Sequence, residues 1–335
     1  MPRKEVLQQL YCDENYYTFT KRMNYELGGY WKYQTIPCGN CWSCKLNYSA
    51  QWATRIMSEV KNSEHNYFIT LTYDEEHIRI AEKIEYNDQV YENDGTWSGT
   101  LWEKDVQKFL NSLRKYFERK GHKGIKYYYC GEYGTETLRP HYHMILMNCP
   151  LDINKFYDTH VDKNYKAHWK SKEIENYWID SEDEKPLGMI DIAEVEWSCA
   201  AYVARYCMKK ISNNVDKSDY CKIGKVPEFV RMSRNPGIGM KYYHDHKYEI
   251  YENDGIIMRT IKGNIGNVKP PKAWDKKLQE EDPELYKKIK EGRNKAKERA
   301  DRLTKEITDY TDYQQERIKE SKILTKGKML PRGDM

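Results

Sequence analysis

The sequence predicts a fold that combines strands and helices, because some segments have the periodicity of strands and others have the periodicity of helices. In residues 66–73, apolar side chains alternate with threonines, which is typical of a strand with one buried face. Residues 103–119 instead repeat apolar side chains every three or four positions, as an amphipathic helix does. Residues 127–133 and 139–147 are expected to be two adjacent strands, with Gly134 and polar residues in the turn between them.

The remaining elements follow from the same periodicities. Residues 49–60 carry apolar side chains at helical spacing, and residues 188–195 predict a strand that joins the sheet before a helix begins near Ser198. Residues 74–100 are polar and rich in Gly, Asn and Asp, which predicts an insertion. Residues 150–185 mix charges with Tyr and Trp, so they form either a solvated insertion with a small aromatic cluster or a surface that stacks bases.

The composition limits the classes of function. A chain of 335 residues can hold one substantial core with appendages, and 32% charged residues place much of the rest at the surface. A net charge of +4 argues neither for nor against nucleic acid. The sequence has no apolar run near the length of a membrane span and no phosphate-binding loop of an ATP-driven helicase. The nine cysteines are expected to be thiols or metal ligands rather than disulfides.

A His-x-His pair lies in the segment 139–147. Because successive side chains of a strand point to opposite faces, His141 and His143 project from one side and can share a divalent cation. Glu132 in the neighbouring strand adds a carboxylate, and the three ligands leave part of an octahedral shell for a substrate oxygen. The alternative is that both histidines are half-buried strand residues without a metal.

Two tyrosines, Tyr202 and Tyr206, are four residues apart and therefore lie on one face of the predicted helix. Lys209 and Lys210 follow one turn beyond Tyr206. A phenol has a pKa of about 10, so a site that uses tyrosine as a nucleophile must polarise its target and stabilise the phenolate. A metal and a lysine do both. The alternative is that the tyrosines only pack the helix onto the sheet.

Three cysteines, Cys38, Cys41 and Cys44, follow one another at intervals of three residues. Such spacing can place three thiolates around a structural Zn²⁺ or supply three ligands to an iron–sulfur cluster, although the fourth ligand is not evident. The cysteines can instead serve only to fix the start of the helix that follows them.

Further candidates for DNA contacts are Thr70 and Thr72, which share one face of the first strand, and Arg139 beside the histidine pair. The two hydroxyls can touch DNA phosphate or support the histidines, and the threonines also suit a strand through their β-propensity alone. Pro236-Gly237 predicts a turn, which either cradles phosphate or is purely structural.

Three motifs occur in a fixed order along the chain. They are Phe68-Ile69-Thr70-Leu71-Thr72-Tyr73, then Gly131-Glu132-Tyr133-Gly134 leading to Arg139-Pro140-His141-Tyr142-His143, and then Tyr202-x-x-x-Tyr206 with Lys209 and Lys210. In this order they resemble the motifs of the HUH endonucleases that start rolling-circle replication, and most of all the replication initiators of the gokushoviruses, single-stranded DNA phages of the microvirus family. The resemblance covers most of residues 36–240.

The resemblance implies an α+β fold built on an antiparallel sheet with the His-x-His strand at its centre, helices on one face, and the other face open to single-stranded DNA. It also implies Mg²⁺ or Mn²⁺ on Glu132, His141 and His143, and attack by Tyr202 or Tyr206 on a scissile phosphate to leave a 5′-phosphotyrosyl link. The implied partners are a single-stranded origin and a host helicase and polymerase, in the cytoplasm of a bacterial host and without a membrane.

We expect four regions in the chain. Residues 1–65 form the cysteine-containing region with its helix, 66–215 the nicking and joining domain, 216–268 an extension of that domain, and 269–335 a charged helical or disordered tail with few apolar anchors. Two other functions compete with the nicking enzyme. One is a non-catalytic, metal-stabilised protein that binds single-stranded DNA, and the other is a metallonuclease that activates water and forms no covalent adduct.

Overall fold

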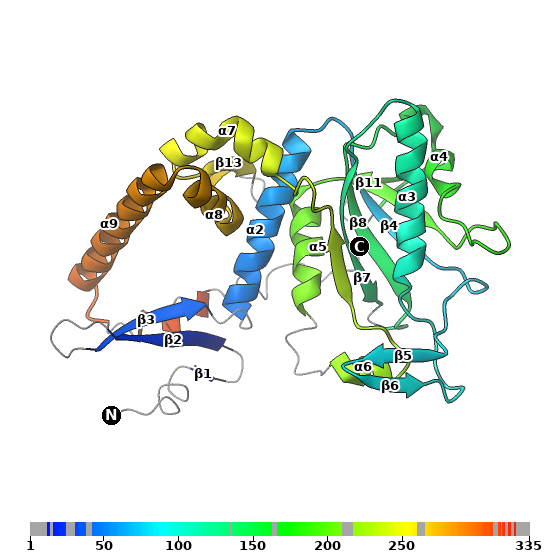
Figure 1. Cartoon of the computed structure of the whole chain (residues 1–335), viewed down its shortest axis with the longest axis horizontal. Coiled ribbons are helices and arrows are strands. Elements are labelled where there is room, and N and C mark those ends of the chain that lie inside the picture. The colour runs from blue at the N-terminus through cyan, green and yellow to red at the C-terminus, as the bar shows by residue number, and fades with distance from the viewer. Residues whose placement is uncertain are drawn as a thin grey trace. The chain divides into compact units, whose positions relative to one another are not determined.

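A computed structural model gives the fold of the chain (Figure 1). The described residues are 12–13, 16–24, 31–37, 42–134, 136–162, 166–209, 217–259, 265–310, 314, 315, 317, 318, 321, 322 and 325. The chain divides into two compact units, one made of Met1–Gln51 with Pro270–Asp334 and the other of Trp52–Lys269. The boundary falls inside α2 (Trp42–Lys61). The boundaries of the four regions expected from the sequence stay a prediction.

A seven-stranded sheet forms the centre of the second unit, and each of its strand pairings is antiparallel. From edge to edge its strands are β12 (Phe229–Met232), β7 (Lys126–Tyr133), β8 (Pro140–Met147), β4 (Asn66–Thr72), β11 (Ile190–Glu194), β10 (Ala167–Ser171) and β9 (Phe156–Val161). The His-x-His strand β8 is an inner strand between β7 and β4. The predicted α+β class, with an antiparallel sheet around this strand, is confirmed.

One face of the sheet is covered by α3 (Glu103–Arg119), whose bounds match the predicted helix (Figure 1). Its first turn carries Glu103 and Asp105, whose negative charges suit the positive end of the helix dipole. Its apolar stripe is buried against the sheet. The stripe consists of Val106, Phe109, Leu110, Leu113 and Phe117.

The opposite face is covered by α2 and α5 (Trp197–Lys209) (Figure 1). Ala53 of α2 and Ala200 of α5 are completely buried in the cluster that these helices form with the sheet. The expectation that one face is open to DNA is therefore wrong. Both helices carry an apolar stripe that must be removed from water, and their small alanines let the helix backbones approach the strands closely.

The segment 150–185 is not the solvated insertion that its charges suggested. Its strands β9 and β10 extend the main sheet, and Ile174 and Trp178 are buried in the core on the side of α3. The Trp178 indole also donates a hydrogen bond to the carbonyl of Thr72, over 2.8 Å. The aromatic residues that were considered for base stacking thus partly serve the protein core.

The segment 74–100 forms a separate hairpin of β5 (Lys83–Tyr86) and β6 (Gln89–Glu92). The two turn residues, Asn87 and Asp88, have positive φ values of 49° and 61°, which Asn and Asp tolerate better than most residues. The hairpin is anchored by a small apolar cluster of its own. Its buried members are Ala81, Ile84, Trp97 and Cys221.

The other elements of the second unit are short. They are a 3₁₀ turn (Ile153–Lys155), α4 (Lys172–Glu175), α6 (Lys217–Lys222), α7 (Met240–Glu252), β13 (Ile256–Arg259) and β14 (Ile265–Val268). The segment 233–239 forms a turn, as Pro236-Gly237 predicted, and Ile238 in it is buried. Its Gly239 amide donates to Glu59 of α2 over 2.7 Å, which supports a structural role for this turn.

Besides the start of α2, the described residues of the first unit form a three-stranded sheet and two further helices. These elements are β1 (Cys12–Asp13), β2 (Tyr16–Asn24), β3 (Trp31–Pro37), α8 (Lys272–Glu281) and α9 (Pro283–Ile307). Asp282 caps α9 by accepting a bond from the Leu285 amide over 3.0 Å. The expectation that the tail has few buried anchors holds for α9, whereas α8 buries Trp274 and Leu278. Among the described residues, no helix is long and apolar enough to cross a membrane.

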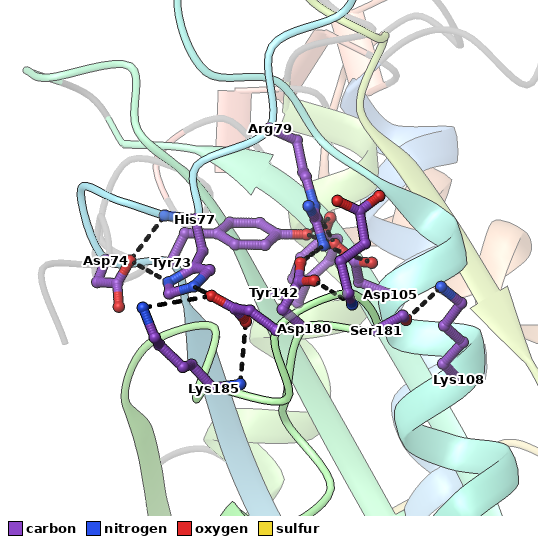
Figure 2. A network of polar contacts seen from close by, with 12 residues as sticks. Tyr73, Asp74, His77, Arg79, Asp105, Lys108, Tyr142, Asp180, Ser181 and Lys185 are labelled. Atoms are coloured by element: carbon purple, nitrogen blue, oxygen red, sulfur yellow. Dashed lines mark hydrogen bonds and ion pairs between the residues drawn. The ribbon is translucent and has the colours of Figure 1, made fainter.

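Behind the histidine strand lies a buried polar network (Figure 2). Tyr142, between the two histidines, points toward α3, where its hydroxyl accepts a bond from the Trp102 amide (2.6 Å) and lies 3.2 Å from the Tyr73 hydroxyl. The Tyr73 hydroxyl in turn donates to Asp105 over 3.0 Å. Burial raises the pKa of both phenols, so they remain protonated donors. The network fastens β8 to β4 and to the first turn of α3.

Arg79 closes this network (Figure 2). Its guanidinium donates two bonds to Asp105, over 2.8 and 3.2 Å, and one to Asp180 over 2.6 Å. Both carboxylates are buried, so a charge-matched partner is needed to offset their loss of solvation.

Replacing Arg79 with Met should lower the free energy of unfolding by about 2–4 kcal/mol, because two buried carboxylates lose their cation. Lys83→Met is the matched control, since Lys83 pairs with Glu85 at an exposed position where solvent screens the pair, so the free energy of unfolding should change much less than in Arg79→Met. Urea unfolding followed by tryptophan fluorescence measures both variants. Equal losses in the two variants would show that the buried network does not carry the stability assigned to it.

Candidate metal centre

Three neighbouring strands bring the predicted site residues together. In the β7–β8 ladder Glu132 is the cross-strand partner of His141, and in the β8–β4 ladder Thr70 is the partner of His143. Alternate residues of a strand share one face, so all four side chains lie on the face covered by α2 and α5. The register of two ladders thus gathers residues that are up to 73 positions apart.

Glu132 and the two histidines form a compact cluster. The Oε1 atom of Glu132 lies 3.1 Å from Nε2 of His143 and 3.7 Å from Nε2 of His141. The two imidazole rings are nearly perpendicular, with their centroids 5.0 Å apart. The side chain of Glu132 is fully buried, that of His143 is 7% exposed and that of His141 is 20% exposed. Solvent therefore reaches the cluster from the side of His141.

The protonation of the two imidazoles follows from their other contacts. Nδ1 of His141 lies 3.1 Å from the Arg139 carbonyl, which can only accept, so Nδ1 donates this bond and Nε2 faces Glu132. Nδ1 of His143 lies 3.0 Å from the hydroxyl of Thr70, which can take either role. Burial, together with the nearby His141, holds the pKa of His143 well below its usual range.

These features fit a divalent cation. Imidazole nitrogens and a buried carboxylate are ligands that first-row transition metals such as Mn²⁺ bind. The three ligand atoms lie within 4.8 Å of one another. Thr70 and the Arg139 carbonyl orient the two rings, as second-sphere groups do in metal sites.

Sequence reasoning missed two neighbours of the cluster. The ring of Phe68 stacks on His143 at 5.4 Å with an interplanar angle of 15°, and the Cys130 thiol lies 3.8 Å from Glu132 Oε1. Both residues precede a site residue by two positions on the same strand, so strand alternation was the signal that could have found them. Being buried, they keep water from the inner side of the cluster.

The tyrosine helix is α5, and it begins at Trp197, one residue from the predicted start. The ring of Tyr202 is buried and meets His143 edge to face, with centroids 5.3 Å apart. Tyr206 and Lys209 lie on the same helix, but their side chains fall outside the described part of the chain, as does all of Lys210. The structure thus brings one of the two predicted tyrosines to the cluster.

Thr72 and Arg139 lie near the cluster, and their side chains form hydrogen bonds with other residues of the protein. The Thr72 hydroxyl donates to the Met189 carbonyl over 3.2 Å. The Arg139 guanidinium donates to Glu75 and, over 2.9 Å, to the Tyr73 carbonyl. Of the three predicted DNA contacts, Thr70 meets a histidine of the cluster through its side chain, and Arg139 meets His141 through its backbone carbonyl.

One residue of the predicted cysteine site lies among the described residues. Cys44 lies in the first turn of α2, whereas Cys38 and Cys41 lie outside the described residues. A structural Zn²⁺ on these cysteines stays a prediction.

The fold and the cluster define an α+β protein with a candidate metal centre on the inner strands of its sheet. Comparison with known proteins gives its family. The family model described as "Replication-associated protein ORF2/G2P" matches residues 66–211, a range that contains Glu132, both histidines and α5. The chain belongs to this family of replication-associated proteins, as its motifs predicted.

Three relatives carry matching descriptions. Replication-associated protein ORF2 of Spiroplasma virus 4 is 39% identical over 285 residues, which cover 83% of this chain and 80% of that protein. Replication-associated protein VP4 of Bdellovibrio phage phiMH2K is 25% identical over 71% of this chain and 66% of its own length. Replication-associated protein ORF4 of Chlamydia phage 1 is 23% identical over 68% of this chain and 50% of its own. No solved structure matches the chain.

Replacing Thr70 with Val should weaken Mn²⁺ binding roughly 10- to 100-fold, because His143 loses the hydroxyl that orients it while the strand keeps a β-branched side chain. Thr70→Ser should restore the affinity. Thr72→Val is the control, since Thr72 lies opposite His141 in the ladder but its hydroxyl donates to the Met189 carbonyl rather than contacting an imidazole nitrogen. Calorimetric titration of the chelator-treated protein with Mn²⁺ measures the affinity. The same titration of His141→Ala, which lacks one ligand, shows which part of the heat signal belongs to this centre. An unchanged affinity in Thr70→Val would remove Thr70 from the site.

Proposed function

We propose that this protein initiates rolling-circle replication of a phage genome by nicking and rejoining single-stranded origin DNA. The observation that carries the proposal is the contact of Tyr202 on α5 with His143 in the cluster of Glu132 and the two histidines. This contact supports the proposal, because a tyrosine nucleophile and a bound cation would then act at one point of the sheet. Membership in a family of replication-associated proteins supports the same function.

Glu132, His141 and His143 would hold Mg²⁺ or Mn²⁺. When bound, such a cation polarises the scissile phosphate as a Lewis acid. Thr70 and the Arg139 carbonyl keep the two rings oriented, and the buried Phe68 and Cys130 exclude water from the inner side. The phosphate approaches from the side of His141, the more exposed of the two imidazoles.

The reaction is a transesterification by tyrosine. The phenolic oxygen of Tyr206 or Tyr202 forms a bond to phosphorus while the bond from phosphorus to the 3′-oxygen breaks. The tyrosine gives up its proton and the departing oxygen takes one up, which leaves a 5′-phosphotyrosyl link and a free 3′-hydroxyl. The number of phosphoester bonds is unchanged, so neither nicking nor joining requires ATP.

The two tyrosines would act in turn. We assign the first attack to Tyr206, because Lys209 and Lys210 lie one turn beyond it and would stabilise its phenolate. The free 3′-hydroxyl would then prime a host polymerase, with a host helicase opening the duplex in the bacterial cytoplasm. After one round Tyr202 would attack the regenerated origin, and the new 3′-end would resolve the first link and close a circle.

Tyr202→Phe and Tyr206→Phe test the nucleophiles, because each keeps the ring and removes only the reactive oxygen. Overlapping single-stranded segments of the phage genome, labelled at the 3′-end, are incubated with Mn²⁺ and separated on denaturing gels. Wild-type protein should acquire the 3′-label, and the double variant should acquire none. Each single variant should nick but fail at the second transfer. Tyr248→Phe, at an exposed position on α7, is the control.

Peptide mapping of the adduct decides the mechanism. A label on a tyrosine other than Tyr202 or Tyr206 would contradict it. Cleavage without an adduct would indicate a hydrolytic metallonuclease, and binding without cleavage would indicate a non-catalytic protein that binds single-stranded DNA.

His141→Ala should reduce nicking at least 100-fold and leave the fold intact, because it removes a ligand from a partly exposed position rather than a core side chain. Chelation of the wild-type protein should give the same loss, and added Mn²⁺ should restore only the wild type. His246→Ala, in an exposed histidine on α7, is the control. Nicking by His141→Ala at the rate of the control would exclude this histidine as a metal ligand.

A further inference from the structure

A second cluster of two histidines and a carboxylate lies at the far side of the same sheet. Its members are His160 on β9, His168 on β10 and Asp191 on β11. We infer that this cluster is a second site for a divalent transition metal, one that fastens the edge of the sheet.

Strand pairing fixes the arrangement of the ligands. His160 and His168 are direct cross-strand partners in the β9–β10 ladder, and their rings stack with centroids 5.2 Å apart. Asp191 lies on the next strand, β11, which pairs with β10. Neighbouring strands are about 4.7–4.9 Å apart, so the three side chains meet on one face without any change of backbone.

The distances suit a single ion. Oδ2 of Asp191 lies 2.6 Å from Nδ1 of His168, and Oδ1 lies 3.8 Å from Nε2 of His160. Ligand atoms held about 2.0–2.2 Å from one metal lie roughly 3.0–3.5 Å apart. The two separations lie on either side of this range, and small side-chain rotations would equalise them. In the part of the chain that the structure describes, these are the two clusters of this kind.

The ligand types select the class of metal. Two imidazoles with one carboxylate favour Zn²⁺ and the neighbouring first-row metals over Mg²⁺ and Ca²⁺. A carboxylate oxygen of Asp162 lies 4.0 Å from Nε2 of His168, whereas the other ring nitrogen, Nδ1, contacts Asp191. His160 is 54% exposed, so an ion enters from solvent, whereas His168 is largely buried.

A metal at this position has a structural consequence. β9 is the edge strand of the sheet, and its side chains from Tyr157 to Val161 are exposed, so little apolar burial holds it in place. An ion shared by β9, β10 and β11 would hold the edge, and the gain would depend on metal concentration because the ion binds only the folded site.

Zn²⁺ titration of the full-length, chelator-treated protein tests the site. His160→Ala is the main variant, because this exposed ring leaves the core unchanged, and Asp191→Asn is a second, nearly isosteric one. Each should bind one Zn²⁺ fewer than wild type by mass spectrometry of metal content. His122→Ala, in an exposed histidine of a loop, is the matched control and should bind as wild type does. Any Zn²⁺ bound by the cysteines is the same in wild type and variants, so it does not affect the difference in Zn²⁺ content.

Hydrogen exchange gives a readout that is independent of nicking. Zn²⁺ should slow exchange at least tenfold in peptides covering β9 and β10 of the wild type and of the His141→Ala/His143→Ala double variant, and should have no effect there in His160→Ala. Two results would overturn the inference: equal Zn²⁺ content in His160→Ala and wild type, or hydrogen exchange in β9 and β10 of the wild type that does not change with Zn²⁺. Either result would mean that His168 and Asp191 form only a hydrogen-bonded pair. Loss of nicking alone would bear only on the first centre.

Discussion

The alternation of side chains along β8 is the constraint on which the rest of the structure depends. Tyr142 points into the core under α3, while His141 and His143, on either side of it, point to the opposite face. A shift of the strand by one residue would place the imidazoles in an apolar core and the phenol in the candidate metal centre. The bonds from Tyr142 to Tyr73 and to the Trp102 amide hold the strand against such a shift. The site is therefore fixed by contacts on the face that it does not occupy.

The proposed metal centre is built on strands, whereas the proposed nucleophiles lie on a helix. Glu132 and both histidines are set by two hydrogen-bonded ladders, so their separations change little without unfolding the sheet. Tyr202 reaches His143 through the packing of α5, whose buried cluster contains small and branched side chains. In the proposed reaction, a helix held by such packing would adjust to a DNA strand while the ligands keep their geometry.

The sequence predicted those features that depend on neighbours along the chain. The bounds of α3 and the pairing of β7 with β8 follow from local periodicity and one short turn, and with them the cluster of Glu132 and the two histidines. The sequence did not predict that β9 and β10 join the sheet. The pairing of β10 with β11 links segments about 20 residues apart, and the polar composition of this region resembles that of an insertion. The cover of α2 and α5 over the histidine face was missed for a related reason, since helix periodicity shows which side is apolar but not which face of a sheet it meets.

The two clusters lie on one face but are too far apart to act as a single two-metal centre. Asp191 is the cross-strand partner of Thr70, and Thr70 is the partner of His143, so two strand spacings, about 9–10 Å, separate their backbones. Paired catalytic ions lie about 3.5–4 Å apart, bridged by shared ligands. The second cluster also includes a residue of the edge strand β9, whose side chains from Tyr157 to Val161 are exposed, whereas the first is surrounded by Phe68, Cys130 and Tyr202. Distance and surroundings therefore agree with the two proposals, in which the inner cluster serves the reaction and the outer one stabilises the edge of the sheet.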